Sequence, residues 1–163
     1  MLRAAAAAKL SLPAEFEAIL AEPTYRVRGA FPTRPWPSCE WIIALPGLSD
    51  SPVAVELSTS VRISKLAPAF AVLHHFMIPF HHPSAIMPFF AGESGRPFSQ
   101  AQFALHERLV RALGYAGLGE VTEGMSLRYV SCGPVGPGAL GNECVSFGAI
   151  LFGDPLGALE EGP

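Results

Sequence analysis

A chain of 163 residues can bury the core of one ordinary domain without help from disulfides or a structural metal. Half of its residues are apolar and only 15% are charged, which excludes a disordered chain and leaves apolar surface for a partner. The formal net charge of -3, without clusters of Lys or Arg, lacks the electrostatic footprint of a nucleic-acid-binding protein, so we expect no nucleic-acid partner.

The N-terminal segment and the cysteines favour a cytoplasmic protein. The alanine run after Arg3 is interrupted by Lys9 and is too short for the apolar region of a signal peptide. No other apolar stretch reaches membrane-spanning length without polar or proline breaks, so no membrane partner is expected. Cys39, Cys132 and Cys144 form no CxxC pair, which favours buried free thiols in a reducing compartment.

Two helices and a rigid connection are expected before the first strand. Residues 4–10 favour a helix by propensity, and Pro13 can open a second helix over residues 14–21. Pro23 ends that helix. The proline-rich segment 31–38 favours extended backbone and prevents regular ladder bonding.

Three strands of an antiparallel sheet are predicted next, over residues 39–45, 53–64 and 69–78. The turn residues of 46–52 join the first two strands in a hairpin. The segment 53–64 alternates apolar and polar residues, as a half-buried strand does. We expect one side to be core and the other to be wet or in contact with a partner; the core side holds Val53, Val55, Leu57, Val61 and Ile63.

The segment 79–97 is rich in Pro, Gly and aromatic residues, and no regular element is predicted there. A loop of this length is often functional. Its apolar groups must be either tucked into the core or left for a partner. The predicted partner-binding residues are Phe80, Met87, Phe89, Phe90 and Arg96.

A well-marked helix follows this segment. Ser99 is the expected N-cap, Gln102 completes a capping box, and Gly114 stands at C′. The predicted core-facing stripe consists of Phe103, Leu109, Val110 and Leu113.

The remaining segments predict two more strands, over residues 126–131 and 145–152. Together the elements predict a single α+β domain over residues 1–163, with frayed ends near 1–10 and 154–163. Its fold class is a mainly antiparallel sheet of about five strands with one or more helices packed on one face.

Two histidine pairs are the only pattern that suggests a transition-metal site. His74 and His75 precede His81 and His82 in HHFMIPFHH. Neutral imidazoles suit zinc, copper or nickel, but a site needs three or four converging ligands. Adjacent residues of a strand face opposite ways, so at most one of each pair can join such a site, and His106 could add a ligand. The alternative is histidines that are half-buried, exposed or hydrogen-bonded to the backbone.

Other catalytic patterns are weaker. Cys132 or Cys144 could pair with a histidine, but no family-specific flank surrounds either cysteine. The glycine-rich stretch GPVGPGALGNE lacks the Lys-Ser/Thr ending of a phosphate loop, and its prolines remove amides that would hold phosphate. We therefore assign no catalytic residue, no metal ligand and no cofactor.

Three segments resemble a pattern of small bacterial immunity proteins from polymorphic toxin systems: VRISKLAPAF (61–70), ERLVRALGY (107–115) and VSFGAILFGD (145–154). In that family a strand of the first type, a helix ending in a Leu-Gly-Tyr cap and a final strand recur in a mixed α+β domain. Phe70 stands where the family often has tyrosine, and segment 79–97 fits no part of the pattern. The resemblance implies a stoichiometric toxin inhibitor without catalytic residues.

The leading functional prediction is therefore a protein-binding module, an immunity protein that neutralises a cognate toxin by direct binding. One alternative is a small metal-dependent enzyme or metal-binding protein that uses His74, His75, His81 and His82. Another alternative is a structural component of a bacterial assembly.

Overall fold

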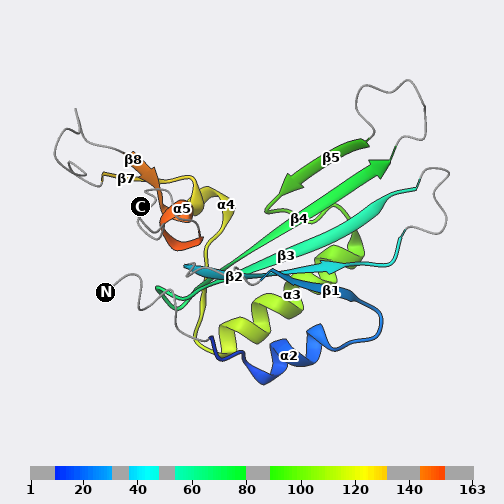
Figure 1. Ribbon diagram of the computed structural model, residues 1–163, viewed down its shortest axis with the longest axis horizontal. Helices are drawn as coiled ribbons and strands as arrows, with labels where there is room; N and C mark the ends of the chain where they lie inside the picture. Colours follow the sequence, from blue (N-terminus) through cyan, green and yellow to red (C-terminus); the bar gives the residue numbers. More distant parts are fainter. Residues whose placement is uncertain (1–9, 31–36, 48–53, 80–88, 132–143, 153–163) are drawn as a thin grey trace, which may run out of the picture.

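An antiparallel sheet forms the centre of the protein, which is described by a computed structural model over residues 10–30, 37–47, 54–79, 89–131 and 144–152. Its strands follow one another in chain order, each pairing with the next (Figure 1). They are β1 (Arg26–Ala30), β2 (Ser38–Ala44), β3 (Glu56–Ser64), β4 (Ala69–Pro79) and β5 (Phe89–Ser94). The short strand β6 (Gly119–Glu120) pairs in parallel with the start of β4. The predicted α+β fold class is confirmed.

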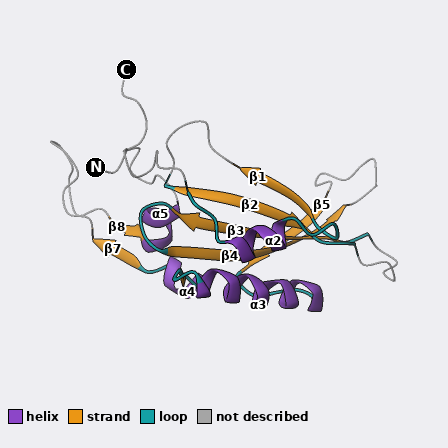
Figure 2. Ribbon diagram, turned by 90° about the horizontal axis from the view of Figure 1, so that it is seen from below, coloured by secondary structure: helices purple, strands orange, loops and turns teal. Residues whose placement is uncertain are grey.

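Two helices, α2 (Ala14–Leu20) and α3 (Gln100–Tyr115), cover one face of this sheet (Figure 2). The main core lies between them and the sheet. Leu57, Val61 and Ile63 of β3 are at most 4% exposed and belong to this core, as the alternation predicts. The helices contribute Phe16, Ile19, Leu105, Leu109 and Leu113.

The opposite face, which we call the open face, is covered at one end only by the residues that the structure describes. There lie α4 (Glu123–Ser126), α5 (Phe147–Phe152) and the hairpin of β7 (Tyr129–Ser131) and β8 (Cys144–Ser146) (Figure 1). Two buried serines of the sheet hold α5: Ser38 donates to the carbonyl of Phe152 at 2.9 Å, and Ser64 to that of Leu151 at 3.0 Å. The serines thus satisfy carbonyls that a helix C-terminus leaves unpaired.

Helix α3 begins as predicted and ends later than predicted. The hydroxyl of Ser99 accepts from the amide of Gln102 at 3.1 Å, which confirms the N-cap. The helix ends in a Schellman motif at Gly117 (φ 82°), three residues beyond the Gly114 expected from the sequence. Phe103 is 49% exposed rather than core, and the apolar stripe runs instead through the buried Leu105 and Ala112.

Other elements differ from the sequence predictions. Segment 79–97 was expected to lack regular structure, yet residues 89–94 form β5, in which Gly92 leaves room for the ring of its cross-strand neighbour Phe76. Residues 147–152 form helix α5 instead of a strand, so the final strand that the immunity resemblance implies ends at Ser146. Strand β1, with its two arginines, was not predicted at all.

Candidate functional site

The adjacent histidines of β4 point to opposite faces of the sheet, as the strand geometry predicts. Nδ1 of His74 lies 3.0 Å from the hydroxyl of Thr59, and its Nε2 lies 3.1 Å from Nδ1 of His106 on α3. On the open face, Nε2 of His75 lies 3.0 Å from the hydroxyl of Ser60. Each histidine therefore bonds to a hydroxyl on β3.

His74 is a neutral member of the core. It is fully buried, and burial lowers its pKa to about 4, with the neighbouring His106 and His75 adding to the effect. The contact continues to the surface, because Nε2 of His106 lies 3.7 Å from a carboxylate oxygen of Glu120 on β6. This chain of polar groups joins the middle of β3 to α3 and β6.

His75 connects three strands on the open face. Its Nδ1 lies 3.4 Å from a carboxylate oxygen of Glu93 on β5, so serine, histidine and glutamate stand in the order of a nucleophile, a base and an orienting acid. However, Ser60 is only 2% exposed, and its main-chain neighbours pair with β2 and β4 instead of offering amides to an oxyanion. We therefore assign this arrangement to cross-strand bonding.

The histidines of the alternative metal-binding hypothesis do not converge in the part of the chain that the structure describes. Within these residues, no group of three or more His, Cys, Asp or Glu side chains could hold a metal ion. The side chains of His74 and His75 point to opposite faces of the sheet, because they are adjacent residues of β4. His81 and His82 lie outside the described residues. Cys39 is a buried free thiol on β2, and Cys132 lies outside the described residues.

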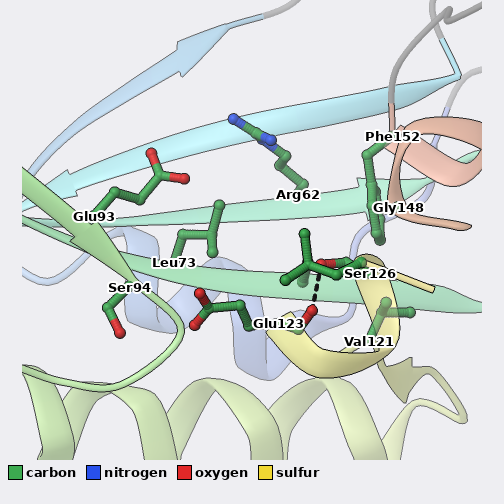
Figure 3. Close-up of a pocket in the computed structure, with 11 residues that line it drawn as sticks. Arg62, Leu73, Glu93, Ser94, Val121, Glu123, Ser126, Gly148 and Phe152 are labelled. Atoms are coloured by element: carbon green, nitrogen blue, oxygen red, sulfur yellow. Dashed lines mark hydrogen bonds between the residues drawn. The ribbon is translucent and has the colours of Figure 1, made fainter. Parts of the chain in front are cut away.

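A hollow of about 350 Å³ opens where α4 and α5 meet the open face (Figure 3). One part of its wall is apolar and comes from four elements or their ends: Leu73, Val121, Leu127 and Phe152. Gly148 allows α5 to approach α4 there, because a Cβ at this position would lie 2.7 Å from that of Ser126. The hollow is therefore built by segments far apart in sequence.

Charged groups form another part of the wall. Glu93 projects from β5 and Glu123 from α4, and Arg62 lies across from them on β3 (Figure 3). Nε of Arg62 donates to Glu40 at 2.9 Å, so Arg62 is paired with a carboxylate that is not among the residues lining the hollow. Glu123 accepts from the amide of Gly95 at 3.0 Å and has no cationic partner among the described side chains.

Three of the five predicted partner-binding residues lie in β5 or just beyond it, and the last residues of this strand, Glu93 and Ser94, line the hollow. Phe80 and Met87 lie outside the described residues, whereas Phe89 and Phe90 begin β5 and Arg96 is exposed just beyond it. Glu93 belongs to the same predicted segment. Ser94 belongs to it as well, and Arg62 lies on the side of segment 53–64 that was expected to be wet or in contact with a partner. Sequence reasoning missed the remaining hollow residues, because no local pattern relates β3, α4 and α5.

No protein-family model, curated protein or solved structure matches the chain. Among the described helices, none is both long enough and apolar enough to cross a membrane.

Proposed function

We propose that the chain is a cytoplasmic protein-binding module that neutralises a cognate bacterial toxin by direct binding. The open face of the sheet carries this proposal. Helices bury the other face, whereas on the open face the described elements cover only the end occupied by α4 and α5 (Figure 1). A sheet face that is left uncovered beside a hollow is a surface that a partner can occupy.

The side chains of the open face suit a non-obligate interface. Ile42 on β2 is 37% exposed, its cross-strand neighbour Arg28 on β1 is exposed, and Arg26 and Glu56 are exposed further along the same face. Mixed apolar and charged groups of this kind are typical of complexes whose partners also exist alone. The resemblance of segments 61–70 and 107–115 to immunity proteins supplies the partner class.

The test uses the product of a toxin-like gene that neighbours the gene for this chain. Coexpression is expected to restore growth, and purified proteins are expected to form a stoichiometric complex in calorimetry. Ile42→Glu should weaken the complex, because it replaces an exposed apolar side chain of the proposed contact surface by a charge. Phe103→Glu is the matched control, since Phe103 is an exposed apolar residue of α3, on the helix-covered side of the sheet.

Thermal melts of both variants establish that they fold. A complex weakened by Phe103→Glu and unaffected by Ile42→Glu would place binding on the helix-covered side of the sheet and contradict the proposal. Failure of every neighbouring toxin-like product to bind would contradict the immunity role. Phe89→Ala and Arg96→Ala then test the predicted anchors beside β5.

A further inference from the structure

The charges around the hollow are unbalanced. Arg62 lines the hollow and is paired with Glu40, which does not line it. The carboxylates of Glu93 and Glu123 also line the hollow. The contacts of Glu93 with His75 and of Glu123 with Gly95 fix the positions of these side chains and bring no permanent cation to them. A bound group that carries positive charge would therefore complement this wall.

The apolar wall limits the shape of such a group. Leu73 is half-buried and Leu127 is exposed, while Val121 and Phe152 are buried parts of the same wall. A long aliphatic stem with a cationic head can cover apolar surface and still reach a carboxylate at the rim. Arginine has this shape, and its planar guanidinium can donate to two acceptors at once in a fixed geometry. A lysine ammonium is a point charge and lacks that geometric selectivity.

We propose that the hollow receives an arginine side chain of the protein partner, with its stem on Leu73 and Leu127 and its guanidinium between Glu93 and Glu123. The inference rests on the proposed function, since it names the anchor by which a partner on the open face is held. Glycine at position 95 is part of the site, because a Cβ there would lie 3.1 Å from Cβ of Glu123 and crowd the carboxylate.

The probe is Nα-acetyl-arginine N-methylamide, followed by NMR of the methyl groups of Leu73, Val121 and Leu127. We expect saturable shifts with a dissociation constant on the order of millimolar, as befits one isolated side chain. The matched ligand is the citrulline analogue, which keeps the shape and loses the charge. It should bind roughly tenfold more weakly, because its hydrogen bonds to carboxylates are no longer charge-assisted.

Three variants locate the interaction. Glu93→Gln and Glu123→Gln keep an oxygen acceptor for His75 and Gly95, so the local structure is retained while the charge is lost. Each should weaken arginine-probe binding by roughly fivefold to tenfold. Glu107→Gln, at an exposed position of α3, should leave binding unchanged.

The outcomes separate this inference from the proposed function. Equal binding of the two ligands, equal effects of Glu93→Gln and Glu107→Gln, or no methyl shifts with the arginine probe would each overturn the arginine site. A partner that binds, is lost with Ile42→Glu and tolerates both glutamine variants would also overturn it, while the proposed function stands. If the arginine probe binds specifically but no product of a neighbouring toxin-like gene binds the protein, the arginine site is supported and the immunity role is contradicted.

Discussion

The two faces of the sheet use similar side chains for different purposes. On the helix-covered face, Thr59 and His74 are fully buried and their hydrogen bond continues to α3. On the open face, Ser60 and His75 make the same type of contact one residue further along each strand, with His75 partly accessible. The comparison teaches that covering by a helix, and not the residue type, decides whether a histidine contributes to the core or to a surface.

The largest expected difference between the faces is a loss of packing. Leu57→Ala on the helix-covered face should lower the free energy of unfolding by about 2–5 kcal/mol, because it leaves a cavity in the core. Leu73→Ala, on the open face, should cost less than about 1.5 kcal/mol, since water can reach the site. Urea unfolding of both variants measures the pair. Equal losses would mean that the open face is as closely covered as the other.

The second comparison concerns pH. The folded pKa of His74 is about 4 against 6.5 for the free side chain, so the unfolded chain binds more protons between these values. The contribution of His74 to the free energy of unfolding is therefore fully present above pH 6.5 and is lost as the pH falls toward 4. The loss is on the order of 3 kcal/mol.

Urea unfolding from about pH 7 to about pH 4.5 measures this effect. His74→Gln should make the free energy of unfolding depend less on pH over this range, because it removes the titrating group from the core. His75→Gln is the matched control on the open face and should keep most of the slope. A profile that depends equally on both histidines would contradict the assignment.

The smallest expected difference isolates one hydrogen bond on each face. Thr59→Val keeps the side-chain shape and leaves Nδ1 of buried His74 without its partner, at a cost of about 1–3 kcal/mol. Ser60→Ala should cost less than about 1 kcal/mol, because His75 is partly accessible and can bond to water. Thermal melts at neutral pH compare the two. A larger loss of stability for Ser60→Ala than for Thr59→Val would show that the Ser60–His75 hydrogen bond is better shielded from water than the Thr59–His74 bond.

Much of the sheet could be predicted because its central strands alternate between a core side and a wetter side. Residues 39–45, 53–64 and 69–78 correspond to β2, β3 and β4 with small changes at their ends. Within that pattern, Ser60 was expected to be wet or in contact with a partner and is buried, since Ile42 and Leu73 flank it across the neighbouring strands. Alternation predicts which way a side chain points and does not predict how closely its neighbours cover it.

The other elements depend on contacts that local sequence does not display. Strand β5 contains a glycine because a neighbouring aromatic ring occupies the space above it, so its sequence is typical of a loop. The apolar run of 145–152 suits a strand or a short buried helix equally, and docking against the sheet and α4 favours the helix for α5. The hollow depends on these same contacts, so sequence reasoning singled out only parts of its wall: Glu93 and Ser94 in segment 79–97, and Arg62 on the wetter side of segment 53–64.

The serine contacts of α5 also bear on the order of folding. The strands from β1 to β5 each pair with the next along the chain, so the meander needs only short loop closures. The bonds from Ser38 to Phe152 and from Ser64 to Leu151 span 114 and 87 residues. Because long closures cost more entropy and form more slowly, α5 is expected to dock last, on a sheet that already exists. Among the described elements, the wall of the hollow that α5 supplies is then the last to be completed, and a nascent chain has an incomplete hollow until α5 has emerged.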